Sequence, residues 1–137
     1  DNEAYRLQTN KRIRERLKTD PAFKTKHNNR KRVHDLVTGK RLSTDDYIGC
    51  NSKEFVKHIE KQFRDGMTWD NYGGKRTDWV IDHIVPLASF DMADEEEAKK
   101  GVHYTNCHPL WFVENAFKSD KTDLKPEDYK FGRDYEF

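Results

Sequence analysis

An aspartate and a histidine stand side by side after a short apolar run, in Trp79-Val-Ile-Asp82-His83-Ile-Val-Pro86. Two amides follow, Asn106 and Asn115, and the second lies in what reads as the start of a helix. Carboxylate and amide oxygens are ligands that a hard cation such as Mg²⁺ accepts while keeping several waters. A histidine with an ordinary pKa of about 6.5 is largely neutral at pH 7 and can take a proton from water. These residue types therefore predict a general base beside a metal ion.

The position of the aspartate and histidine in a strand limits how they can act together. Adjacent residues of a regular strand point to opposite faces of the sheet. For both side chains to face one site, the pair has to sit where the strand ends, and Pro86 three residues later fits such an end. We therefore expect a strand over Trp79–Asp82 that stops at the pair.

The stretch from Trp79 to Lys121 resembles the HNH nuclease motif, also called the ββα-metal or His-Me finger. The family pattern is Asp-His-Ile-x-Pro, then an Asn, then an Asn or His on the following helix. This chain has Asp82-His83-Ile84-Val85-Pro86, then Asn106, then Asn115. A full set of this kind is much harder to obtain by chance than an isolated Asp-His pair.

The segments before the motif also resemble one group of HNH proteins, the small endonucleases of phages and mobile genetic elements. The similar runs are residues 48–63 and 66–73, so the resemblance covers roughly residues 44–121. The charged N-terminal region matches that group only in character.

The resemblance implies a role for each polar residue of the motif. Asp82 and Asn115 would be the metal ligands, with Mg²⁺ as the expected ion and Mn²⁺ as a substitute. His83 would be the general base, and Asn106 the structural amide that holds the loop carrying it. Lys118, one turn after Asn115, would face the same way and contact the phosphate.

Two departures from the family pattern concern the segment between the expected strands. Many such proteins have Leu-Gln where this chain has Cys107-His108, so His108 adds either a phosphate contact or nothing. The stretch Leu87–His103 is long and acidic, and we expect an insertion that points away from DNA.

The net charge of +1 hides a gradient along the 137 residues. Residues 1–41 hold thirteen Lys and Arg against five Asp and Glu, a net +8, whereas residues 82–137 hold seven against thirteen, a net −6. This asymmetry favours contact of the N-terminal region with a polyanion. Two segments are the candidate DNA-binding residues: the cluster Arg30, Lys31 and Arg32, and the pair Lys75 and Arg76 beside Gly73-Gly74.

The pattern of apolar and breaking residues predicts an α+β chain. Residues 1–41 would form a basic helical DNA-contacting region and residues 42–137 the HNH nuclease domain, with its motif core at 79–121. The expected helices and the second strand follow the capping and periodicity signals, whereas the tail beyond Asp123 is turn-like. The helices are Glu3–Leu17, Pro21–Val37 capped by Asp20, Ser52–Arg64, Asp94–Lys100 and Phe112–Ser119, and the strand is Thr105–Leu110.

The composition bounds the core and the cofactors. Hydrophobic residues make up 34% and charged residues 37%, so aromatic side chains should supply much of a small core. The two cysteines, Cys50 and Cys107, exclude the four-cysteine structural zinc site of some HNH proteins. A disulfide between them is disfavoured if the protein works in a reducing cytoplasm. No run reaches transmembrane length, which predicts no membrane partner.

Taken together, the resemblance implies a metal-dependent endonuclease that hydrolyses phosphodiester bonds in double-stranded DNA and leaves a 5′-phosphate. We expect a phage or mobile-element homing or nicking enzyme, a monomer or homodimer in the cytoplasm of a bacterial host cell. Two alternatives stay open: a bacteriocin-type toxin nuclease with an immunity partner, and a DNA-binding module with an inactive nuclease core.

Overall fold

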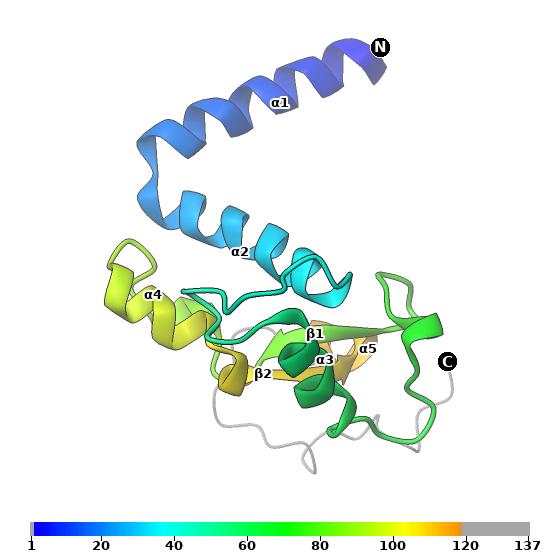
Figure 1. Cartoon of the computed structure of the whole chain (residues 1–137). Coiled ribbons are helices and arrows are strands. Elements are labelled where there is room, and N and C mark those ends of the chain that lie inside the picture. The colour runs from blue at the N-terminus through cyan, green and yellow to red at the C-terminus, as the bar shows by residue number, and fades with distance from the viewer. Residues whose placement is uncertain (1, 119–137) are drawn as a thin grey trace.

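The computed structural model describes residues 2–118 and shows an α+β protein, mostly helical, with one small two-stranded antiparallel sheet (Figure 1). The expected tail beyond Asp123 and the last residues of the motif core, 119–121, lie outside the described residues. In chain order the elements are α1 (Asn2–Thr19), α2 (Pro21–Val37), α3 (Ser52–Glu60), β1 (Trp79–His83), α4 (Glu95–Val102), β2 (Cys107–Trp111) and α5 (Phe112–Lys118), with 3-10 turns at Trp69–Asn71, Leu87–Ser89 and Tyr104–Asn106.

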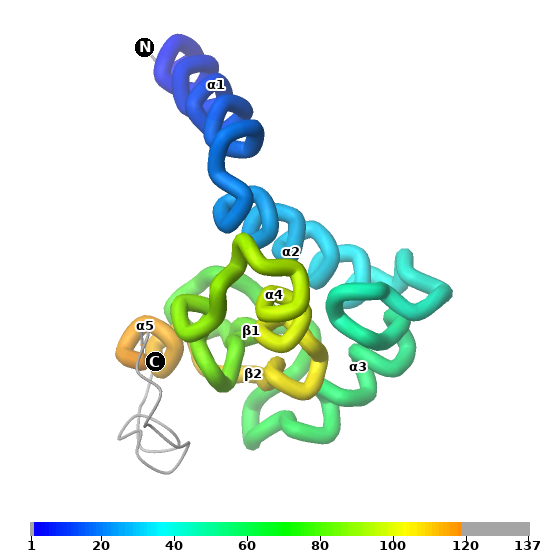
Figure 2. Tube along the Cα trace, turned by 90° about the vertical axis from the view of Figure 1, so that its left-hand side faces the viewer, coloured from blue at the N-terminus to red at the C-terminus, as the bar shows by residue number. Residues whose placement is uncertain are grey.

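The first two helices form as their sequence signals predict. The Asp20 side chain caps α2 by accepting a hydrogen bond from the Phe23 amide at 3.1 Å, and Pro21 takes the first helical position. Gly39 follows with φ +81, a left-handed conformation that ends the helix. Helix α1 buries none of its side chains and projects away from the body, whereas α2 lies across it (Figures 1 and 2).

Helix α3 begins as expected and ends earlier. Asn51 and Glu54 form a reciprocal capping box at its start. The predicted end at Arg64 is wrong, because the backbone tightens after Glu60 and the Phe63 amide bonds the Glu60 carbonyl three residues back. This turn brings the Phe63 ring to 5.0 Å from the Trp79 ring.

The strands β1 and β2 pair antiparallel, so that Asp82 lies opposite His108 and His83 opposite Cys107. The second strand starts two residues later than predicted, because Tyr104–Asn106 forms a 3-10 turn. Helix α5 follows β2 without a loop. The Glu114 carboxylate, fully buried, accepts from the Trp111 amide and pairs with Arg64, which ties α5 to the segment that follows α3.

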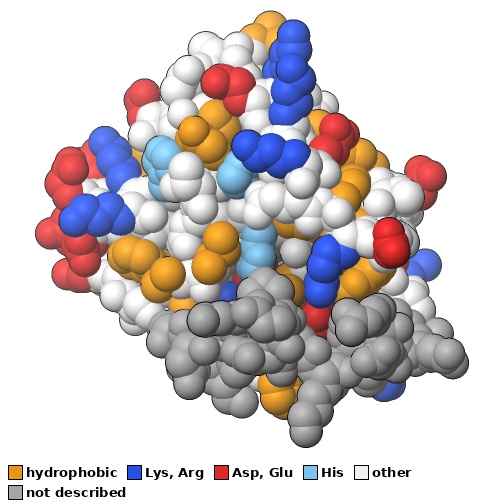
Figure 3. Space-filling model, turned by 90° about the horizontal axis from the view of Figure 1, so that it is seen from below, with side chains coloured by type: hydrophobic (Ala, Val, Ile, Leu, Met, Phe, Trp, Pro, Cys, Tyr) orange, Lys and Arg blue, Asp and Glu red, His pale blue; other side chains and the backbone are white. Residues whose placement is uncertain are grey.

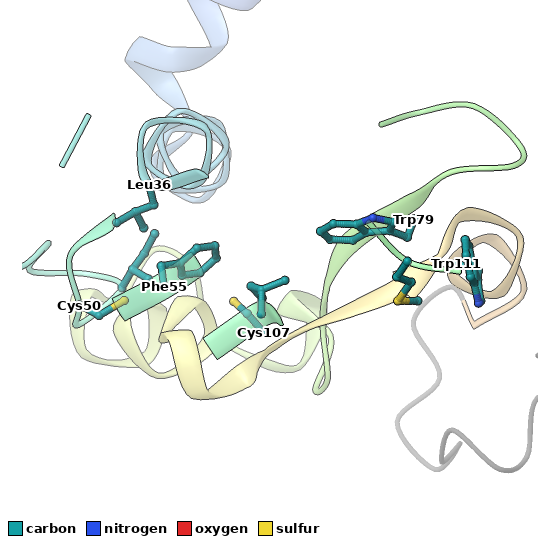
Figure 4. Packing of buried hydrophobic residues seen from close by; sticks show 9 residues of the cluster. Leu36, Cys50, Phe55, Trp79, Cys107 and Trp111 are labelled. Atoms are coloured by element: carbon teal, nitrogen blue, oxygen red, sulfur yellow. The ribbon is translucent and has the colours of Figure 1, made fainter. Parts of the chain in front are cut away.

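One apolar cluster joins the helices to the hairpin (Figure 4). Leu36 of α2, Phe55 of α3 and Trp79 of β1 are wholly buried in it. Aromatic side chains supply much of this cluster, as predicted, although Phe117 is 46% exposed and does not belong to it. A second, smaller cluster of Met92, Ala98 and Val102 packs against Ala22 of α2, so the segment between the strands closes onto the body.

Among residues 2–118, no helix has both the length and the apolar character that crossing a bilayer requires.

The two thiols lie in the apolar cluster, and burial raises the pKa of Cys50 to about 11 and that of Cys107 to about 12. Because the thiolate is the reactive form, we expect neither cysteine to react with a thiol-specific disulfide reagent at pH 8 in the folded protein. Both should react at once in denaturant. Rapid labelling of one thiol under native conditions would contradict this packing.

Candidate active site

The Asp82 carboxylate on β1 is the centre of a buried polar cluster. Its Oδ2 accepts from Lys118 Nζ at 2.6 Å and lies 2.8 Å from His108 Nε2. Burial acts to raise the pKa of Asp82, but the hydrogen bonds from His108 and Lys118 and their charges outweigh it, so that the pKa lies below its ordinary value. Asp82 is therefore a carboxylate anion at neutral pH.

Lys118, the last described residue of α5, points into the molecule and is only 2% exposed. Besides Asp82, its ammonium donates to the carbonyl oxygens of His83 at 2.5 Å and Ile84 at 2.9 Å. All three hydrogens of an ammonium are thus satisfied. In this arrangement the charge of Lys118 is used inside the protein, and a contact of Lys118 with a phosphate stays a prediction.

His83 lies in different surroundings from its neighbour Asp82. Its side chain lines a cavity of about 510 Å³ together with Ile81, two residues earlier, and Asn115 of α5. The buried His83 Nε2 has no hydrogen-bond partner among the described residues. Burial, helped by the charges of Lys118 and His108, lowers the pKa of His83 despite the Asp82 carboxylate. The imidazole is therefore neutral at pH 7 and able to accept a proton.

The structure therefore separates two residues that the sequence had placed in one site. Strand β1 stays regular to His83, its last residue, so the two side chains leave on opposite faces, with Asp82 towards His108 and Lys118. Strand β1 stops at the pair, as expected, and its last residue is one position later than predicted. Asn115 lines the cavity of His83, so the predicted ligands Asp82 and Asn115 also lie in different surroundings.

Asn106 holds the segment that directly follows His83. Its Nδ2 donates to the Val85 carbonyl at 3.0 Å and to the Gly101 carbonyl at 2.8 Å, and its Oδ1 accepts from the Val85 amide at 2.9 Å. Its backbone carbonyl also accepts from the Ile84 amide at 2.8 Å. These bonds place Asn106 where the resemblance implies an amide that holds the loop after His83. A role of Asn106 in catalysis stays a prediction.

The predicted DNA-binding cations of α2 have three different placements. Arg30 is exposed and lines the cavity of His83, and Lys31 is exposed outside it. Arg32 is half-buried, and its guanidinium lies 4.0 Å from the centre of the Tyr47 ring. Arg32 therefore makes a cation–π contact with Tyr47, and its role in DNA binding stays a prediction.

The cations of the loop before β1, Lys75 and Arg76, are exposed as a DNA-contacting loop requires. The loop itself is ordered by Asp78, which accepts from the Lys75 amide at 3.0 Å. The close approach of Asp78 Oδ2 to Gly73 leaves no room there for a side chain, because an added Cβ would lie 2.6 Å from it.

Sequence reasoning gave little weight to His108, which the structure places against Asp82. The register of the two strands could have identified His108, because His108 lies directly opposite Asp82 in the hairpin. Sequence reasoning also missed the residues that share the cavity with His83 and Arg30. Their signal is the four-residue spacing of Lys26, Arg30 and His34, which places them on one helix face.

The oxygen atoms around Asp82 suit a hard cation. The carboxylate and two backbone carbonyls already hold one positive charge, the Lys118 ammonium, in an all-oxygen setting. Within residues 2–118, no group of three or more His, Cys, Asp and Glu side chains could hold a metal ion. A divalent ion at Asp82 would therefore have a single acidic ligand among these residues and water for most of its shell, because Asn115 lies in different surroundings.

Charged side chains are segregated on the surface. Figure 3 shows histidine and Lys or Arg side chains next to one another on one face, with acidic side chains gathered at an edge of that face. Helix α4 accounts for one acidic group, because Asp94 caps it and Glu95, Glu96 and Glu97 fill its first turn. An anionic ligand would meet the basic part of this face and avoid the acidic edge.

Replacing Lys118 with methionine tests the buried ion pair. The change keeps the side-chain volume but leaves the Asp82 carboxylate buried without its ammonium, and we expect a loss of about 3–5 kcal/mol of unfolding free energy in urea titrations. Adding Asp82→Asn should recover part of that loss. The matched control is Lys100→Met, whose ammonium is largely exposed and pairs with Glu97. Equal stability of the two methionine variants would contradict the assignment.

Replacing Asn106 with alanine tests the holding of the His83 segment. The Val85 amide loses its acceptor, whereas the Ile84 amide keeps the backbone carbonyl of residue 106. We expect the Val85 amide to exchange hydrogen markedly faster and the Ile84 amide to change much less, and stability to fall by about 1–2 kcal/mol. Unchanged exchange at Val85 would show that the side chain does not hold this segment.

The chain is similar in sequence to two viral proteins whose names state no function. No protein-family model and no solved structure matches the chain. It is similar to two proteins of Acanthamoeba polyphaga mimivirus: "Uncharacterized protein L246", 37% identical over 109 residues, and "Uncharacterized protein L426", 34% identical over 124 residues. The matches cover 79% and 89% of this chain but 47% and 52% of those proteins, so the chain spans about half the length of the curated relatives it matches.

Proposed function

We propose that this protein is a metal-dependent DNA endonuclease of the HNH kind. The observation that carries the proposal is His83, a half-buried and neutral imidazole whose buried Nε2 has no hydrogen-bond partner among residues 2–118, in a cavity that cationic residues of α2 also line. A base for water beside a basic wall for a phosphate is the arrangement that phosphodiester hydrolysis requires.

The order of elements supports a ββα core. Strands β1 and β2 pair as a hairpin, and α5 follows β2 directly. The motif residues Asp82 and His83 come from the first strand, Asn106 precedes the second, and Asn115 lies on the helix. The hairpin β1–β2 and helix α5 would be the ββα-metal core that the sequence resemblance implies.

In the proposed reaction, His83 Nε2 accepts a proton from the water that attacks the phosphorus atom. The bond from phosphorus to the 3′-oxygen breaks and a solvent water protonates that oxygen, which leaves a 3′-hydroxyl and a 5′-phosphate. Asn106 holds residues 84–85 and thereby the position of the imidazole. Mg²⁺, for which Mn²⁺ could substitute, would stabilise negative charge on the leaving oxygen and on the phosphate. Asp82 and Asn115 would hold the ion if Asp82 exchanged Lys118 for it and the two side chains, which lie in different surroundings here, came together. Asp82 is suited to this role because its low pKa keeps it ionised.

Double-stranded DNA is the proposed partner, and the chain acts as a monomer or homodimer. The basic α1 and α2 and the exposed Lys75 and Arg76 support a polyanionic partner. The viral origin of the two relatives supports a role in a virus or mobile genetic element. The two buried thiols fit a reducing cytoplasm.

One observation favours a second candidate, a DNA-binding module with an inactive nuclease core. The Lys118 ammonium neutralises Asp82, the acidic ligand on which a metal would depend, and a permanently held pair would leave the carboxylate unable to bind a divalent ion. Both candidates bind duplex DNA, and only the nuclease cuts it.

The test of the proposal is cleavage of supercoiled plasmid in the presence of Mg²⁺. We expect conversion to open-circular or linear DNA, no conversion in excess EDTA, and a loss of about 10²-fold or more in His83→Ala. Free imidazole should restore part of the lost activity by entering the enlarged cavity. The matched control is His103→Gln, a half-buried histidine that does not line the cavity of His83.

The outcomes separate the two candidates. Wild-type protein that shifts duplex DNA on a gel but never cuts it would support the inactive core. Cleavage that survives His83→Ala at the wild-type rate would remove His83 from the role of base, and unfolding midpoints show that each variant is folded.

A further inference from the structure

The cavity of His83 has a second wall that the motif does not describe. Half of its lining comes from α2, which crosses the hairpin (Figure 1). The described lining residues are Lys26, Asn29, Arg30, Val33 and His34 of α2, with Tyr72, Ile81, His83, Leu87 and Asn115.

The basic residues of this wall are placed by helical spacing. Lys26, Arg30 and His34 recur every four residues and therefore share one face of α2. That helix is fixed against the hairpin, because Leu36 is wholly buried in the main cluster and Val33 packs against it. The wall thus presents two permanent cations and one imidazole from a rigid element.

Unpartnered polar atoms show that the cavity is suited to a polar ligand. Asn29 is 4% exposed, and its Oδ1 has no hydrogen-bond partner among residues 2–118. His83 lines the same cavity, and its buried Nε2 also lacks a hydrogen-bond partner within the described part of the chain. Buried polar atoms are nearly always hydrogen-bonded in proteins, so two residues with such atoms in the lining of one cavity favour a hydrogen-bonding ligand or its water there.

The charges decide the class of that ligand. None of the described lining residues carries a carboxylate, whereas Lys26 and Arg30 bring positive charge. Tyr72, Ile81 and Leu87 add an apolar side to the cavity. A volume of about 510 Å³ is within the range that takes a ligand of nucleotide size. An anionic group attached to an apolar or aromatic body, such as a nucleotide unit, fits this lining.

We infer that the inner face of α2 is a phosphate-binding subsite for duplex DNA, in which Lys26, Arg30 and His34 hold the backbone across the cavity from His83. The choice of DNA rests on the proposed function, whereas the anion site rests on the cavity itself. The subsite places one strand between α2 and the hairpin, so that the phosphate next to Lys26 and Arg30 lies near the imidazole.

The experiment is equilibrium binding of a short fluorescent duplex by anisotropy, in EDTA so that no cleavage occurs, over a range of salt concentrations. Lys26→Ala and Arg30→Ala should each weaken binding about tenfold and lower the slope of log K against log salt by roughly one. The matched control on the same helix is Lys24→Ala, which removes an exposed charge outside the cavity. We expect this control to stay close to wild type.

A second pair of variants adds a charge instead of removing one. Asn29→Asp keeps the shape of the side chain and puts an anion into the cavity, so binding should fall at least as much as in Arg30→Ala. Asn28→Asp makes the same change one residue away, outside the cavity lining, and should have a much smaller effect. Unfolding midpoints measured on both variants separate lost binding from lost folding.

Different experimental results would overturn the phosphate-binding subsite and the nuclease activity. Wild-type protein that does not cut plasmid but loses duplex binding on Lys26→Ala and Arg30→Ala would keep the subsite and remove the nuclease. Equal losses in the cavity variants and their controls would mean a diffuse basic surface and overturn the subsite, even if plasmid is cut. Absence of duplex binding by wild type would also overturn it.

Discussion

The buried ion pair between Asp82 and Lys118 is the interaction on which the hairpin and the last described helix depend. It joins residues 36 positions apart, with 2.6 Å between the carboxylate and the ammonium. Removing two charges from water costs several kcal/mol per ion, and an ion pair offsets that cost only when its remaining hydrogen bonds are made. Here they are made, because Lys118 also bonds two carbonyl oxygens and Asp82 also contacts His108.

This pair also determines where His83 lies. Lys118 bonds the backbone carbonyls of His83 and Ile84, and Asn106 bonds both backbone groups of Val85. Three consecutive residues are thus held from α5 on one side and from the turn before β2 on the other. With the backbone fixed and Asp82 committed to one face, strand geometry leaves the imidazole facing the cavity. The position of the candidate base therefore follows from contacts of its backbone.

Structure that depends on residues close together in sequence, such as helix caps, could be predicted from the sequence. Contacts between residues far apart in sequence could not. The start of α2 follows from Asp20-Pro21 and that of α3 from Asn51 and Glu54, because these caps act within one turn. The sequence predicted that Lys118 contacts a phosphate. Helical spacing places Lys118 near Asn115 but does not show that the Asp82 carboxylate, 36 residues earlier, lies next to it in the fold. Likewise the contact of His108 with Asp82 depends on hairpin register across a long insertion, and the wall of α2 on how that helix packs.

The neutralisation of Asp82 by Lys118 and the basic residues of α2 both favour a phosphate in the cavity. An unpaired carboxylate beside the cavity would repel a phosphate at short range, and in a medium of low dielectric that repulsion would be strong. Lys118 cancels this charge inside the protein, while Lys26 and Arg30 keep positive charge on the cavity side. The acidic residues of α4 lie at the start of that helix, where its dipole stabilises them. A chain with a net charge of only +1 can thus present a locally positive site, because its charges are sorted by position.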